Sequence, residues 1–106
     1  MRILEFEVKG QKMIKKADCD FTNIVAGSNG YLRAKFYFEP DDWLDCKKVA
    51  GFWSGGQEYA ALLDDDGSCV IPKEALTRHY FLVQVTGANE YRRIKTTKTE
   101  VSQEVT

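Results

Sequence analysis

The chain has 106 residues and a formal net charge of −1, from 15 basic and 16 acidic side chains. A chain of this length predicts a single domain over residues 1–106. A charge balance so close to zero creates no overall field that attracts phosphate backbones or anionic lipid, so we expect neither a nucleic-acid partner nor a membrane partner.

Alternation of apolar and polar residues predicts strands from the first residues onward. In ILEFEV (3–8), Leu4, Phe6 and Val8 share one face, which is the pattern of a half-buried strand. In YLRAKFYF (31–38) the same alternation is longer, and the residues that share its apolar face are Leu32, Ala34, Phe36 and Phe38. Both segments are therefore predicted to lie with one face on the core.

Residues 48–63 predict a β-hairpin, because two strand-like runs flank SGGQ, a Gly-Gly turn signal. Phe52 and Trp53 are adjacent, so we expect them to point to opposite faces and only one of them to enter the core. The run DDDGS (64–68) predicts a second turn, followed by a short strand at CVI (69–71).

The segment IPKEALTRHY (71–80) is the one helical candidate, with Pro72 suited to a first helical position, and we predict one short helical turn near residues 72–78. Strands follow at HYFLVQVTG (79–87) and TKTEVSQEV (97–105), with the last few residues frayed. About seven or eight short strands predict an all-β fold, an antiparallel β-sandwich or small barrel.

The acidic clusters favour turns over chemistry. Asp41, Asp42 and Asp45 follow Pro40 directly, as turn and cap residues do, and no partner signature makes them a general acid and base. The acidic run 64–66 lacks the distal glutamate of an EF-hand, since Ala75 stands there. We predict no catalytic residue and no enzyme activity.

The three cysteines, Cys19, Cys46 and Cys69, are odd in number and widely spaced, so they form neither a CxxC motif nor a disulfide framework. The only histidine, His79, lies beside none of them in the sequence. We therefore expect reduced thiols, no metal and no cofactor. The N-terminus has no apolar run of signal-peptide or membrane-spanning length, so we expect no export signal.

Aromatic side chains are the remaining candidates for a binding site, because exposed aromatics form sugar-stacking platforms and interface hot spots. We expect Trp43 to pack in the core. Partly exposed aromatics are expected at Trp53, Tyr59 and Tyr91.

From about Gly27 to Thr97, the chain carries a series of short motifs in a specific order. They are an F-x-F strand at Phe36 and Phe38, Asp42-Trp43, the run Lys48-Val49-Ala50-Gly51-Phe52, Asp66-Gly67 with Cys69, Ile71-Pro72 with Glu74 and Leu76, Val83 with Val85 and Gly87, and Thr96-Thr97. In order and spacing this series resembles a module of tail- and baseplate-associated proteins of bacteriophages and prophages of Gram-positive bacteria.

The resemblance implies a β-sandwich similar to the N-terminal domains of baseplate upper proteins, which dock a longer fibre or receptor-binding region onto the tail. The scaffold residues are then Phe36, Phe38, Trp43, Phe52, Pro72 and Leu76, with Cys46 and Cys69 as small apolar residues. The chain departs from that pattern because it stops just after the closing strand. We therefore expect a stand-alone tail accessory or assembly protein, or an excised domain.

On this basis we expect a virion structural protein of the tail, made in the bacterial cytoplasm without a signal peptide. Its expected partners are other phage tail or baseplate proteins and further copies of itself, as a homo-oligomer. The alternative function is a carbohydrate-binding module for cell-wall polysaccharide that uses Trp53 and Tyr59. A third class is a small hydrolase that uses Asp41, Asp42 or His79.

Overall fold

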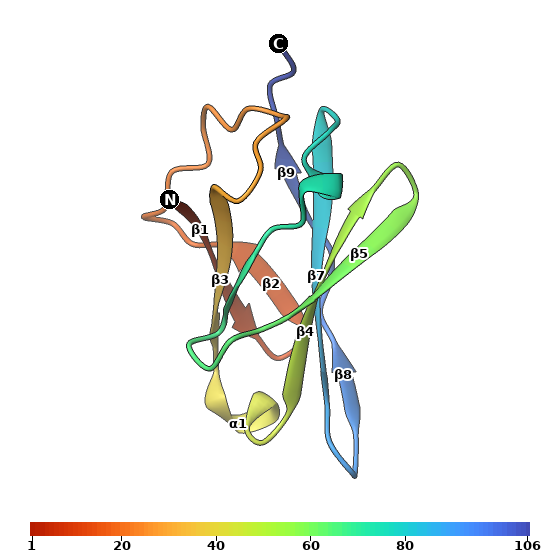
Figure 1. Cartoon of the computed structure of the whole chain (residues 1–106). Coiled ribbons are helices and arrows are strands. Elements are labelled where there is room, and N and C mark those ends of the chain that lie inside the picture. The colour runs from red at the N-terminus through yellow and green to blue at the C-terminus, as the bar shows by residue number, and fades with distance from the viewer.

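Two β-sheets pack face to face in the computed structural model, which describes residues 1–106 (Figure 1). The small sheet has the order β2-β1-β3-β6, from β1 (Arg2–Lys9), β2 (Lys12–Lys15), β3 (Leu32–Phe38) and β6 (Ser68–Val70). The large sheet has the order β5-β4-β7-β8, from β4 (Lys47–Ser54), β5 (Gln57–Leu62), β7 (Tyr80–Ala88) and β8 (Arg93–Lys95), and β9 (Thr99–Ser102) also pairs with β7. The predicted all-β, sandwich-like fold is confirmed.

The faces that alternation predicted are the faces that the core uses. In β1 the buried side chains are Leu4, Phe6 and Val8. In β4 Phe52 is fully buried whereas Trp53 is half-buried on the outer face, as expected for adjacent strand residues. Buried residues from both sheets form one hydrophobic cluster, and its burial is the main source of stability.

One strand pair runs in an unexpected direction. β1 and β3 are parallel, in register from Arg2 opposite Leu32 to Val8 opposite Phe38, whereas the other pairs of named strands are antiparallel. The small sheet is therefore mixed, although the sequence pattern predicted antiparallel pairing. Alternation shows which face of a strand is buried but not which way the strand runs.

Three short elements were not predicted. β2 and β8 span four and three residues, which is too short for alternation to be visible. A one-turn helix, α1 (Pro40–Trp43), stands where the sequence predicted a plain turn. The predicted helical turn near 72–78 is present as a 3₁₀ turn, η1 (Lys73–Ala75). Neither helical segment has the length or the apolar character needed to cross a membrane.

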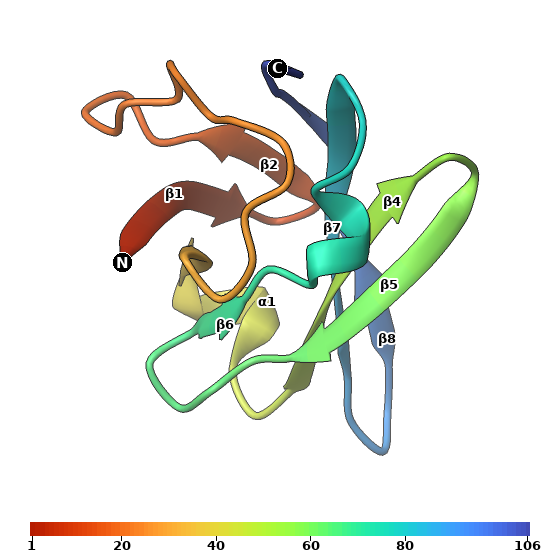
Figure 2. The ribbon, with the colours of Figure 1, turned by 45° about the horizontal axis from the view of Figure 1, so that its top comes forward.

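The sandwich has two distinct ends. α1 and the turn between β7 and β8 lie at one end, and the C-terminus lies at the other (Figure 1). Along its sides, Figure 2 shows β5 running at the periphery with β4 beside it, while β7 lies inside the large sheet. The α1 end and the outer strand β5 therefore both lie at the surface of the molecule.

Candidate functional site

The α1 end of the sandwich is closed by Trp43. The fixed φ of Pro40 suits the first position of α1, and the helix ends as Trp43 turns inward, leaving its side chain 1% exposed. The indole lies 5.0 Å from the ring of Phe38 between centroids, and its Nε1–H donates a hydrogen bond of 2.9 Å to the carbonyl of Gly10. The next residue, Leu44, is left 62% exposed.

The turn between β7 and β8 lies beside α1 and is organised by Asn89. The Asn89 side-chain oxygen accepts hydrogen bonds from the backbone N–H groups of Tyr91 (2.8 Å) and Arg92 (3.1 Å). The Asn89 backbone N–H donates to the carbonyl of Arg92 at 3.0 Å. This local bonding is typical of asparagine in turns, and it holds Tyr91 with its side chain 91% exposed.

Two contacts join this turn to the α1 segment. The Arg92 guanidinium donates a hydrogen bond to the carbonyl of Asp42, and the Asn89 side-chain amide lies 3.7 Å from the sulfur of the buried Cys46. Segments far apart in the sequence are therefore held together. Together with Asn89 and Arg92, their side chains line a shallow groove of about 510 Å³, and we call the surface formed by five of them the tip: Asp41, Leu44, Asp45, Glu90 and Tyr91.

The tip combines an apolar pair with an acidic rim. Tyr91 is the most exposed large apolar side chain, at 91%, and Leu44 ranks third after Met1, at 62%. The carboxylates of Asp41, Asp45 and Glu90 line the same groove and outnumber its one guanidinium, Arg92. Exposed apolar side chains with a polar rim are a common form of protein interface. The arrangement fits a partner surface that offers an apolar side chain flanked by lysine or arginine.

The three predicted binding aromatics are not brought together. Tyr59 lies opposite Phe52 in the β4–β5 ladder and so points to the core side, whereas Trp53 lies opposite Glu58 on the outer face. Tyr59 and Trp53 therefore cannot form one stacking platform for a sugar. The Lys98 ammonium also lies 4.0 Å from the centroid of the Trp53 ring and covers it. Of the three, only Tyr91 is freely exposed.

The residues expected to form the scaffold lie in or against the core. The fully buried ones are Phe36, Trp43, Phe52 and Leu76, while Phe38 and Pro72 are half-buried.

Cys46 and Cys69 are buried and Cys19 is half-buried, and all three thiols are free. Burial raises the pKa of the Cys69 thiol to about 12, because a thiolate is poorly solvated in an apolar environment.

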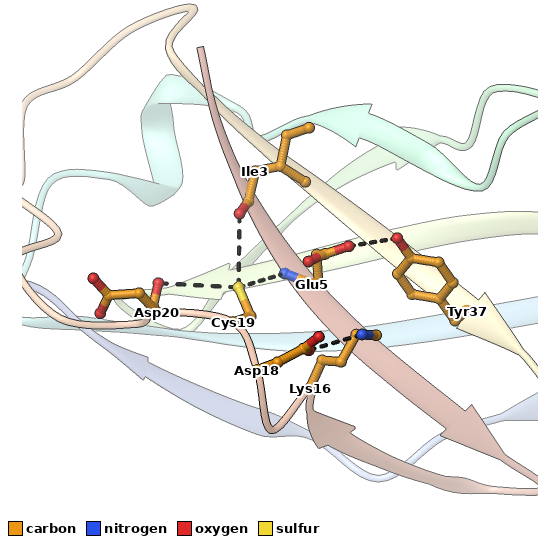
Figure 3. Close-up of polar contacts among 7 residues, drawn as sticks. All are labelled: Ile3, Glu5, Lys16, Asp18, Cys19, Asp20 and Tyr37. Carbon is orange, nitrogen blue, oxygen red and sulfur yellow. Dashed lines mark hydrogen bonds and ion pairs between the residues drawn. The ribbon is translucent and has the colours of Figure 1, made fainter.

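A polar cluster covers part of the outer face of the small sheet (Figure 3). The backbone N–H of Glu5 donates to the Cys19 sulfur at 3.3 Å, and the thiol lies 3.7 Å from the carbonyl of Ile3. The Tyr37 hydroxyl donates to the Glu5 carboxylate, and this hydrogen bond raises the pKa of Tyr37. A phenol with a raised pKa is a weaker acid near neutral pH, so this pair is poorly suited to proton transfer.

The same cluster includes the loop after β2. Lys16 and Asp18 form an ion pair of 2.7 Å, which raises the pKa of Lys16 and lowers the pKa of Asp18. The Lys16 ammonium also lies 5.5 Å from the centroid of the Tyr37 ring. These contacts hold the loop against the sheet, and each group has its partner within the chain.

A larger open groove, of about 710 Å³, lies between β3, the start of β4 and the acidic turn after β5. The Lys48 ammonium lies 5.2 Å from the centroid of the Phe38 ring and donates to the carbonyl of Cys46 at 3.3 Å. In the turn, Asp66 accepts hydrogen bonds from the Ser68 hydroxyl and backbone N–H, which lower the pKa of Asp66. The turn predicted at 64–68 is present, with the Asp66 carboxylate bonded inside the turn and the Asp64 carboxylate paired with Arg33 of β3 at 2.6 Å.

The residues considered as candidates for a hydrolase site do not lie together. Asp41 and Asp42 belong to α1, beside the end of β7, whereas His79 precedes the start of that nine-residue strand. No group of three or more histidine, cysteine or carboxylate side chains is placed to hold a metal ion.

The protein is a β-sandwich, and at one end of it the tip presents exposed side chains on a hydrogen-bonded base. Comparisons with protein-family models, with curated proteins and with solved structures gave no match. The geometry of this chain is therefore the basis for a functional proposal. Sequence patterns identified Tyr91 but missed Leu44, because only the folded chain brings the turn 89–92 beside α1.

Proposed function

We propose that this protein is a structural part of a phage particle, a tail or baseplate docking module that acts through protein–protein contacts. The observation that supports it best is the tip, where Tyr91 and Leu44 stand exposed on a buried base. The order of motifs between Gly27 and Thr97 resembles a tail-associated module. This resemblance is the reason for placing the protein in a phage particle.

The construction of the tip favours a protein partner. A docking surface gains affinity when its side chains need little further ordering on binding, and here Trp43 and Asn89 hold the two exposed apolar residues in place. Aromatic side chains at the centre of an interface often carry much of its binding energy. The proposed partners are other tail or baseplate proteins with a basic rim, together with further copies of this chain.

The test is incorporation into particles. Prophage particles are purified from cells that produce either the wild-type chain or the double variant Tyr91→Ala, Leu44→Ser, and the chain is quantified by mass spectrometry relative to other tail proteins. We expect a defined stoichiometry for the wild type and a loss of tenfold or more for the variant, on the order of a lost hot spot.

The control is Tyr31→Ala, which removes a half-exposed tyrosine just before β3, away from α1. This variant is expected to be incorporated like the wild type. Absence of the wild-type chain from particles that contain the other tail proteins would contradict the proposed function. Equal incorporation of the tip variant would contradict the role of the tip.

A further inference from the structure

Strand edges in this fold differ in how they are protected. β2 carries Lys12 and Lys15 at its ends, and Met13 in its middle has its N–H and carbonyl bonded to the side chains of Thr97 and Thr99. β8 has three residues, two of them basic. Such short length and basic side chains are common ways to prevent strand pairing between molecules.

β5 has none of this protection. It spans six residues, QEYAAL, without lysine, arginine or proline, and its pairing with β4 is unbroken from Val49 opposite Leu62 to Ser54 opposite Gln57. β5 forms one edge of the large sheet, at the periphery of the molecule (Figure 2). An edge strand of this kind is open to pairing with another strand.

The hairpin geometry shows which backbone groups are free. Ser54 and Gln57 flank a two-residue turn, Gly55-Gly56, with both φ angles positive (59° and 79°). The flanking pair of such a turn is hydrogen-bonded, and the bonding direction then alternates along the strand. Glu58, Ala60 and Leu62 therefore point their N–H and C=O groups away from β4, and none of the three appears among the chain's backbone hydrogen bonds outside its helices and strands. We call these three residues the β5 edge.

We propose that two copies of this chain associate through antiparallel pairing of their β5 edges, which joins their five-stranded sheets into one. In an antiparallel ladder, opposite residues point to the same face. If Ala60 lies on the two-fold axis, it meets Ala60 of the second copy, and Glu58 meets Leu62. This register pairs every free group of one edge with a free group of the other, and the side chains at the axis are small.

Charge at the two ends of β5 supports a second copy as the occupant. The Arg78 side chain lies against the turn before β5, with its Nε 2.8 Å from where a Cβ on Gly55 would be. Asp65 lies in the turn after β5. Neither forms an ion pair within the chain. Antiparallel pairing brings the start of one β5 to the end of the other, so Arg78 of each copy approaches Asp65 of its neighbour.

This inference rests on the proposed function, because it specifies how copies of the chain associate, but its tests use the purified chain alone. The dimer can therefore be absent while the tip still docks into particles, and the dimer can form while docking of the tip fails. Sedimentation velocity of the wild type is expected to show a monomer–dimer equilibrium with a dissociation constant on the order of micromolar, as for a small interface. A monomer at every concentration up to about 1 mM would overturn the proposal.

Ala60→Lys tests the strand itself, because it places like charges opposite each other at the axis. Ala60 is exposed, so the monomer should remain folded, which circular dichroism checks. We expect dimer affinity to fall at least tenfold, whereas Ala17→Lys, the same change at an exposed alanine in the loop after β2, should leave it unchanged. Equal affinity for the wild type and Ala60→Lys would exclude β5 as the interface.

Charge reversal tests the register. Arg78→Asp or Asp65→Arg alone turns two attractive contacts into repulsive ones, with an expected loss of affinity of about tenfold. The double variant that carries both changes exchanges the charges and should restore the dimer. Failure of the double variant to recover would contradict this register. Hydrogen exchange adds a direct readout, since the amides of Glu58, Ala60 and Leu62 should become protected as protein concentration rises.

Discussion

The tip and the β5 edge are the two surfaces proposed to bind a partner, and they offer different chemical groups. The tip offers side chains, Leu44 and Tyr91, which stand on a base formed by the buried Trp43 and the hydrogen-bonded Asn89. The edge offers backbone groups on a strand that is bonded on one side and has no fully buried residue.

This difference indicates how each surface would select its partner. A rigid surface of side chains discriminates by shape and charge, so the tip is suited to one particular protein surface. An open strand edge accepts any strand that matches its register, so its selectivity depends on the charges at its ends, Arg78 and Asp65. This distinction is tested by variants that weaken the base of the tip and by matched variants in the β4–β5 hairpin.

The largest effect is expected at the base of the tip. Trp43→Ala removes a fully buried indole, its tilted ring contact with Phe38 and its hydrogen bond to Gly10, and should lower the free energy of unfolding by about 3–5 kcal/mol. Trp53→Ala in the hairpin removes a half-buried ring and should cost about 1–2 kcal/mol. Urea unfolding followed by far-UV circular dichroism gives both values, and equal losses would contradict the distinction between the two regions.

Two in-strand glycines give a matched comparison of the same regions. A Cβ on Gly87 would lie 2.8 Å from Cζ3 of Trp43, in a rigid ring, whereas a Cβ on Gly51 would meet the flexible end of the Glu58 side chain. We expect Gly87→Ala to cost about 1–3 kcal/mol, as overpacking does, and Gly51→Ala to change stability by no more than about 0.5 kcal/mol. The melting temperatures of the two variants provide the measurement, and a larger loss for Gly51→Ala would show that β4 is the less tolerant strand.

A smaller effect is expected from Cys69 in β6, beside the turn that ends the β5 segment. The pKa of Cys69 is raised by burial from its ordinary value of 9.0 to about 12, so above pH 9 the unfolded chain loses this proton while the folded chain keeps it. The free energy of unfolding should therefore fall as pH rises, by about 1.4 kcal/mol at pH 10 relative to pH 8.

Cys69→Ala removes that contribution, so its stability difference from the wild type should shrink by this amount between pH 8 and pH 10. Urea unfolding of both proteins at the two pH values gives the comparison. A difference that stays constant with pH would show that the thiol ionises equally in the folded and unfolded chains.

Much of the sandwich could be predicted because its signals are local. Alternation identified the buried faces of β1 and β3, the Gly-Gly turn identified the β4–β5 hairpin, and the adjacency of Phe52 and Trp53 required that one of them face outward. Short elements escaped prediction because three or four residues, as in β2, β8 and α1, carry too few positions to show a period.

By itself, the sequence determined the all-β class, many of the side chains of the core and the exposure of Tyr91, because each depends on the order of neighbouring residues along one strand or turn. The tertiary structure alone decided that β1 and β3 run parallel, that Trp53 and Tyr59 face apart, and that Leu44 stands beside Tyr91. It also decided that β5 is left with an unpaired edge. Each of these depends on which strands lie next to one another, and strand neighbours are selected by packing of the whole chain, which no local pattern records.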